Sequence, residues 1–125
     1  MESVLALQAP LPIGPYSQAI EYRSFIFCSG QIPLDPRTSD IVDQDIRVQT
    51  TQVLNNLKAI LKSAGCAMNT VVKTTVFLQD MADFDAFNEV YATYFSEPYP
   101  ARSCVQVAAL PKNAMIEIEA IAVRY

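Results

Sequence analysis

The chain of 125 residues contains no histidine. Histidine is the commonest general base in enzymes and the commonest metal ligand in proteins. Its absence excludes a Ser-His-Asp or Cys-His mechanism within this chain. Carboxylates, arginine, lysine, tyrosine, thiols and backbone amides remain as the groups available for chemistry, and we expect neither a metal nor a cofactor.

Cysteine is scarce as well. Cys28, Cys66 and Cys104 are widely spaced, odd in number and lack a C-x-x-C pair. This spacing disfavours both a disulfide framework and a zinc site.

Charge of either sign is sparse. Charged residues make up 18% of the chain, against about 25% in an average globular protein. The nine lysines and arginines are scattered singly and the net charge is −4, so no basic run exists to bind a phosphate backbone. We therefore expect no nucleic-acid partner. A small, charge-poor domain also indicates that part of its surface is buried against copies of itself.

Long hydrophobic runs are missing too. No stretch approaches the roughly 20 apolar residues that span a bilayer, so we expect no membrane partner. The first residues resemble neither a secretory signal nor a transit peptide, because no lysine or arginine precedes Arg23 and prolines are frequent. The expected location is cytoplasmic.

The residues that are present predict a single domain, 1–125, with α+β architecture. Residues 17–22 and 25–29 are expected to form a hairpin around Arg23-Ser24, and residues 30–44 a loop. Apolar residues at intervals of three and four predict a helix over residues 45–64, with Gly65 as its left-handed cap. Residues 71–78, 103–108 and 115–123 have the composition of strands.

A second helix is predicted between the strands at 71–78 and 103–108. Asp80 is expected to cap it, with Asp83 placed as in a capping box. The apolar stripe of this helix consists of Phe84, Phe87, Tyr91, Tyr94 and Phe95, and the helix must end before Pro98.

The predicted order is β-β-α-β-α-β-β, with two helices on one face of one mixed sheet. In the last strand Ile116, Ile118, Ala120 and Ala122 alternate with a second set that includes Glu117 and Glu119. The first set suits a floor beneath helices. The second faces a side that no helix is left to cover, which predicts a homo-oligomer.

The last two strands are expected to pair as a hairpin, which lets Arg102 and Glu117 flank one cleft. A guanidinium grips a carboxylate through two charge-assisted hydrogen bonds, and a carboxyl group near an apolar interface can exchange a proton near neutrality. The pair therefore suits a small anion with a reactive atom beside it. A structural Arg–Glu bridge between subunits explains the same spacing and remains open.

Several other residues have both a chemical and a structural interpretation. Cys104 lies two residues from Arg102 and is either a nucleophile or a small buried side chain. Tyr16 can present its hydroxyl to a cleft or pack as an aromatic ring, and Asn88 can line a cleft or cap a helix. Lys73 suits a Schiff base only if it is buried.

Five segments of the chain resemble the RidA family, and together they extend over nearly its whole length. They are Ile13-Gly14-Pro15-Tyr16, Ser29-Gly30-Gln31-Ile32-Pro33, Val72-Lys73-Thr74-Thr75-Val76-Phe77, Pro100-Ala101-Arg102-Ser103-Cys104-Val105 and Ile116 to Val123. The resemblance implies a chorismate-mutase-like fold and a homotrimer with clefts between subunits. It also implies hydrolysis of 2-iminobutanoate, 2-iminopropanoate and their enamine forms to 2-keto acids and ammonia.

The resemblance also implies roles for individual residues. Arg102 matches the arginine that holds the substrate carboxylate, and Glu117 matches the acid that orients or activates the attacking water. The remaining matches are substrate-binding positions: Tyr16, Ser29, Gly30, Asn88 and Cys104. The segment from Asn88 to Arg102 is shorter than in typical bacterial members, which leaves the preferred substrate open.

Two alternatives to an imine deaminase remain. One is a non-catalytic trimer that binds keto acids and regulates another process. The other is the ribonuclease or translation-inhibitor activity known from some family members, against which the acidic composition argues. A chorismate mutase is a more distant possibility, because one arginine is little provision for a dicarboxylate.

Overall fold

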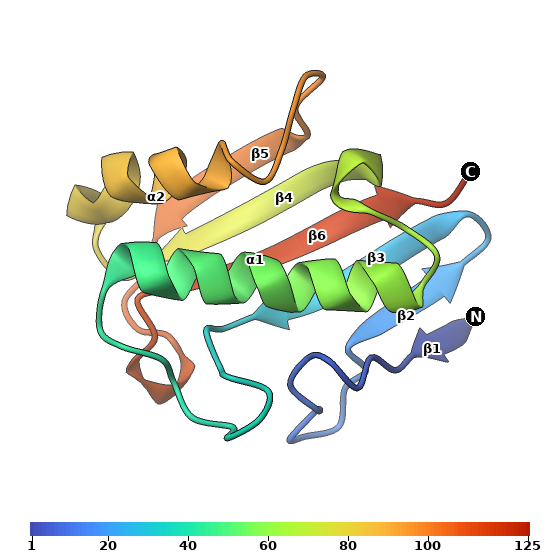
Figure 1. The fold of residues 1–125 in the computed structure, drawn as a ribbon, viewed down its shortest axis with the longest axis horizontal. Coiled ribbons are helices and arrows are strands. Elements are labelled where there is room, and N and C mark those ends of the chain that lie inside the picture. Colours follow the sequence, from blue (N-terminus) through green and yellow to red (C-terminus); the bar gives the residue numbers. More distant parts are fainter.

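The computed structural model describes residues 1–125 as one six-stranded sheet with two α-helices (Figure 1). The strands lie in the order β1-β2-β3-β6-β4-β5. In chain order the elements are β1 (Glu2–Val4), β2 (Ala19–Tyr22), β3 (Phe25–Gln31), α1 (Ile46–Ser63), β4 (Val71–Leu78), α2 (Phe84–Tyr91), β5 (Ala101–Gln106) and β6 (Ile116–Val123). The predicted α+β class and the single mixed sheet are confirmed, and β1 is an additional short strand.

Helix α1 begins and ends as the sequence predicts. The Asp45 carboxylate accepts hydrogen bonds from the backbone N–H groups of Arg47 and Val48, which satisfies two of the donors left free at a helix start. At the other end Gly65 has φ +75°, and the N–H of Cys66 donates to the Leu61 carbonyl. This is a Schellman ending, which favours glycine at the left-handed position.

Helix α2 is shorter than its apolar stripe predicts. Asp80 caps a single 3₁₀ turn by accepting from the Ala82 N–H, and the α-helix follows from Phe84 to Tyr91. Tyr94 and Phe95 lie beyond the helix, because the chain tightens into turns in which the Thr93 and Tyr94 N–H groups bond three residues back. Phe95 remains buried in the same core as the helix.

The predicted hairpin of the last two strands is wrong. Strand β5 pairs in parallel with β4 at the edge of the sheet, and β6 lies between β3 and β4, antiparallel to both. The cause is α2, since a helix joining two strands carries the chain back to the end where it started and so makes those strands parallel. Figure 1 shows α2 beside β4 and β5.

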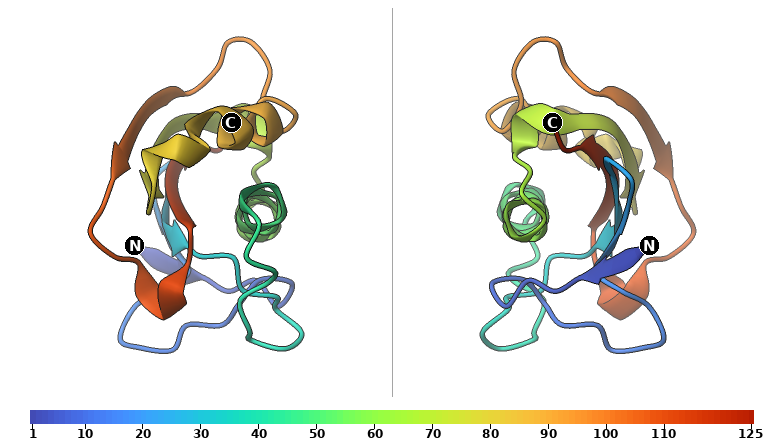
Figure 2. Two further views of the ribbon diagram at one scale, coloured as in Figure 1. Left: turned by 90° about the vertical axis from the view of Figure 1, so that its left-hand side faces the viewer. Right: turned by 90° about the vertical axis from the view of Figure 1, so that its right-hand side faces the viewer.

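The two faces of the sheet have different surroundings. Both helices lie on one side, and the sheet curves around α1 (Figure 2). Beneath them the predicted set Ile116, Ile118, Ala120 and Ala122 is buried, as expected. On the opposite face Phe25 and Phe27 remain more than 40% exposed, at 43% and 44%. The predicted homotrimer that would cover this face stays a prediction.

Neither helix has the length and apolar character that a membrane crossing requires.

Candidate functional site

Arg102 lies on β5 with its side chain on the helix-covered face. Its guanidinium carbon is 5.6, 5.2 and 4.8 Å from the ring centroids of Phe84, Phe87 and Tyr91, all of which belong to α2. Its Nη1 donates a 2.8 Å hydrogen bond to the Asn88 side-chain oxygen. Three rings and one amide therefore hold the cation, because aromatic faces attract cations and the amide oxygen accepts from one edge of the fork.

No carboxylate neutralises Arg102. The ion pairs of the structure involve Arg37, Arg47 and Arg124. A cavity of about 370 Å³ lies in front of Arg102, lined also by Asn88, Tyr91, Ala92, Tyr99 and Pro100. The half-buried guanidinium thus keeps free donors beside an open space that a small anion can enter.

Cys104 follows two residues along β5 and packs at the edge of the core. Burial raises the pKa of its thiol, and the positive charge of Arg102 opposes that shift only in part. The thiol therefore stays protonated near neutral pH, which favours the structural interpretation of this residue over the nucleophilic one.

Glu117 belongs to a second cluster on β6, with Gly30 against it. A Cβ added at Gly30 would lie 2.1 Å from Glu117 Oε2 and 2.8 Å from its carboxyl carbon. Only glycine leaves room for the carboxylate there. The pairing of β3 with β6 shifts between Cys28 and Gln31, so Ser29 and Gly30 lie in a bulge. Bulges bend a strand and leave backbone groups unpaired, and they are frequent beside active sites.

Tyr16 and Ser29 lie in the same cluster as Glu117. All line a cavity of about 360 Å³, together with Pro10, Leu11, Ile13, Gly30, Gln31, Ile32, Leu34 and Pro111. Tyr16 is half exposed. The Ser29 hydroxyl donates to the Ser17 carbonyl at 2.6 Å and its N–H to the Gln18 carbonyl, so Ser29 offers a ligand no free donor of its own.

The Glu117 carboxyl has an altered proton affinity. Burial raises its pKa, and the negative charge of Glu119, two residues along β6, raises it further. A carboxyl group with a raised pKa takes up and releases a proton closer to neutrality, which suits general acid–base chemistry.

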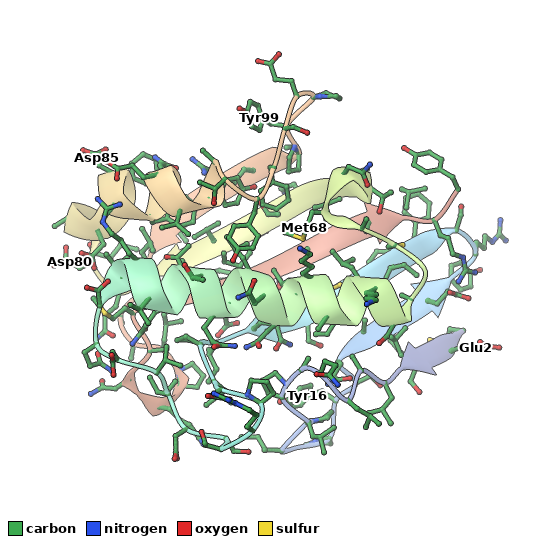
Figure 3. All side chains as sticks on the ribbon, in the orientation of Figure 1. Glu2, Tyr16, Met68, Asp80, Asp85 and Tyr99 are labelled. Carbon is green, nitrogen blue, oxygen red and sulfur yellow. The ribbon has the colours of Figure 1, made fainter.

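The two clusters lie on opposite faces of the sheet in one chain. Arg102 contacts α2, whereas Glu117 alternates with the buried residues of β6 and points to the uncovered face. Figure 3 shows Tyr99 and Tyr16, one from each cavity, far apart in that view. The expectation that Arg102 and Glu117 flank one cleft of the same hairpin is therefore wrong, because β5 and β6 do not pair.

Sequence reasoning missed the aromatic rings around Arg102. The sequence predicts only that Phe84, Phe87 and Tyr91 belong to the apolar stripe of a helix, and they do pack in or against the core. Their spacing with Asn88 between them places ring, amide and ring on one helix face, and this was the available signal. Lys73 lies on the uncovered face, where it lines a cavity together with Glu119. No group of three or more potential metal ligands occurs in the structure.

The fold identifies a small α+β protein with one mixed six-stranded sheet and both helices on one side. Comparison with known proteins then gives its family. The family model described as "Endoribonuclease L-PSP" matches residues 6–124. The chain belongs to this family, also known as the RidA family, and the resemblance found in the sequence is confirmed.

Individual relatives are similar over nearly the whole chain. A mouse protein named 2-iminobutanoate/2-iminopropanoate deaminase is 52% identical over 117 residues, which is 94% of this chain and 87% of the relative. The crystal structure of RidA from the Antarctic bacterium Psychrobacter superposes with a TM-score of 0.95 at 43% identity, covering 98% of this chain and 99% of the other. The structure of E. coli TdcF with bound serine gives a TM-score of 0.95 at 46% identity and covers both chains completely.

Proposed function

We propose that the protein hydrolyses reactive 2-imino acids and their enamine tautomers, such as 2-iminobutanoate and 2-iminopropanoate, to 2-keto acids and ammonia. The observation that carries the proposal is Arg102: a guanidinium without an acidic partner, held against aromatic rings and facing a cavity. The mouse relative named for this activity supports the choice of reaction.

In the proposed complex Arg102 binds the substrate carboxylate through the donors that Asn88 does not occupy. A carboxylate and a guanidinium fork match in shape, so two parallel hydrogen bonds fix the plane of the substrate. The imine carbon, which adjoins the carboxylate, is then held at a defined place beside the cavity.

Glu117 of a neighbouring copy completes the proposed site. It accepts a proton from a water molecule as the water oxygen bonds to the imine carbon, and passes that proton to the imine nitrogen, so that the C=N bond becomes a C–N single bond in a carbinolamine. The proton of the carbinolamine hydroxyl then moves to the nitrogen through the same carboxyl group, the C–N bond breaks to release ammonia, and the C=O bond of the 2-keto acid forms. Water is the only co-reactant, and general acid–base assistance of this kind contributes roughly 10²–10⁴-fold.

The positions of the two cavities support a site shared between copies. The cation and the carboxyl group lie on opposite faces of one sheet, which favours a substrate held between two chains over one held within a single chain. A closed homotrimer, in which every interface joins the Arg102 cavity of one copy to the Glu117 cavity of the next, satisfies both requirements with a single repeated contact. It also buries the exposed apolar residues of the uncovered face.

The test is an assay in which a threonine dehydratase generates 2-iminobutanoate and the decay of the imine is followed. The wild-type protein should accelerate the decay, and Arg102→Ala should abolish the acceleration because it removes the group that binds the carboxylate. Arg47→Ala is the matched control, since Arg47 is an exposed arginine paired with Glu89.

Other outcomes identify the alternatives. Tight binding of 2-oxobutanoate without any acceleration would indicate a regulatory binding protein and end the deaminase proposal. Cleavage of RNA by the pure protein, lost with Arg102→Ala, would indicate a ribonuclease. Wild-type acceleration by Arg102→Ala would show that the residue assignment is wrong.

A further inference from the structure

Tyr91 is the ring closest to the Arg102 guanidinium, with a distance of 4.8 Å from its centroid to the guanidinium carbon. It is only 5% exposed and packs between Phe87 and Phe95, with ring centroids 5.3 and 4.5 Å away. Among the three rings around Arg102 it alone carries a polar atom. That hydroxyl is therefore the only atom of the three rings that can fix their orientation through a directional hydrogen bond.

The hydroxyl of Tyr91 is hydrogen bonded to the Thr74 hydroxyl at 2.8 Å, and both groups are buried. Thr74 is the β4 residue that lies directly opposite Arg102 of β5 in the parallel register. The bond thus ties α2 to the sheet at the residue pair that carries the arginine. A buried polar pair of this kind has one satisfactory arrangement, since an unpaired hydroxyl in the core is costly.

We propose that Tyr91, fastened by Thr74, is a positioning residue that sets the plane of the Arg102 guanidinium and directs its free edge into the cavity. The identity of the ligand, a small carboxylate, rests on the proposed function. The positioning itself rests on the register of β4 and β5 and on the contacts of Tyr91.

A ring suits this task better than an acidic side chain. A carboxylate partner would occupy two of the guanidinium donors and cancel the charge that attracts the substrate. An aromatic face holds the cation through its π electrons and leaves the N–H groups free. Asn88 takes a donor at one edge, so the opposite edge of the fork remains for a ligand.

The experiment measures binding of 2-oxobutanoate by calorimetry, together with KM and kcat for imine decay. Tyr91→Leu removes the ring and the hydroxyl, and we expect Kd and KM to rise about tenfold, the loss of one partly desolvated cation–π contact, with a smaller change in kcat. Tyr91→Phe keeps the ring but loses the hydrogen bond to Thr74, and it should give a Kd between those of the wild type and Tyr91→Leu. Thr74→Val breaks the same hydrogen bond from the other side with little change of shape and should give a similar intermediate Kd.

Phe95→Leu is the matched control. It truncates a buried ring of the same cluster that packs on Tyr91 but is not one of the three rings around the Arg102 guanidinium. A purely structural role for the cluster predicts that Tyr91→Leu and Phe95→Leu lower the melting temperature alike and leave Kd unchanged in the folded protein. That result, or equal increases of Kd in both variants, overturns the proposal.

The binding measurement separates this inference from the proposed reaction. If the wild-type protein binds 2-oxobutanoate without accelerating imine decay, the reaction is wrong, and a raised Kd for Tyr91→Leu still supports the positioning role. If Arg102→Ala loses activity while Tyr91→Leu keeps the wild-type Kd and KM, the reaction stands and the positioning role fails.

Discussion

At Gly30 and Arg102 the size and type of the neighbouring side chains decide which groups are free to act. Gly30 is the clearest case, because its missing side chain is what lets the Glu117 carboxyl group lie against the β3 bulge. The two positions are far apart in the sequence, and neither alone indicates the contact. Arg102 shows the complementary case, since its donors are free only because its neighbours are aromatic rings and an amide instead of acids.

Gly30→Ala is expected to lower kcat strongly without unfolding the protein. The new Cβ would overlap the end of the Glu117 side chain, which is flexible and can rotate away, so the loss of stability should be small. Displacing the proposed base should lower kcat by roughly 10²-fold, the lower range of what acid–base help contributes. Thermal unfolding and the imine assay measure the two effects. A variant that keeps the wild-type kcat would show that the position of Glu117 does not matter for the reaction.

Glu119→Gln is expected to shift the pH profile of the reaction. Glu119 raises the pKa of Glu117, so its neutralisation lowers that pKa. The proposed base works when deprotonated, and activity is lost as the pH falls through the Glu117 pKa. The acidic limb of kcat/KM should therefore move to lower pH in Glu119→Gln. A profile measured between weakly acidic and neutral pH tests this, and an unshifted acidic limb would remove Glu117 as the titrating group.

The Glu117 carboxyl group should also affect stability. Its contribution to stability decreases as the pH rises, whereas the activity decreases as the pH falls. Because the pKa of Glu117 is raised in the folded chain, the native state holds this proton more tightly than the unfolded state. The carboxyl group therefore lowers stability as the pH rises from the ordinary glutamate pKa through the raised one. Glu117→Gln should remove this part of the decline.

At the scale of elements, local signals predicted the helices and strands better than their pairing. The start of α1 at Asp45 and its end at Gly65 follow from side-chain capping and from the left-handed backbone, which depend on a few neighbouring residues. The end of α2 has no such local signal, because the chain after Tyr91 continues into turns and still buries Phe95. The apolar stripe continues to Phe95, yet the helix stops at Tyr91.

The pairing of β5 differs most from the prediction, and the difference has a physical explanation. Strands that follow each other in sequence often form hairpins, which favours pairing of 103–108 with 115–123. The helix between β4 and β5 carries the stronger constraint, because a strand–helix–strand unit makes its two strands parallel neighbours. The β5–β6 connection crosses β4 in the structure, and β6 lies between β3 and β4.

The wrong hairpin also places the site residues wrongly relative to one another. Alternation along the last strand was predicted correctly, since Ile116 and Ile118 share the buried face of β6, and Arg102 and Cys104 share one face of β5. Which face of β5 matches which face of β6 depends on the strand between them. That relation is a property of the whole sheet, so the sequence could name candidate residues but could not predict their division into two clusters.

At the scale of the whole molecule, each chain presents two separate cavities, one beside Arg102 and one beside Glu117. The proposed trimer joins them, and its interface would lie on the face where Phe25 and Phe27 are exposed. In this proposal the substrate site forms only when the trimer assembles. A chain that cannot associate would keep every candidate residue and still lack a site.

Mixing two inactive variants tests this directly. Arg102→Ala and Glu117→Gln, carrying different tags, are co-expressed, and assemblies that hold both tags are purified. If each site takes Arg102 from one copy and Glu117 from the next, every mixed trimer contains one interface with both residues intact. Mixed assemblies should then recover about one third of the wild-type activity per trimer, because one of the three equivalent sites is restored. Two copies of the same variant with different tags are the control and should stay inactive. Mixed assemblies without activity would contradict a site shared between neighbouring copies, because a site contained in one chain would be damaged in both kinds of subunit.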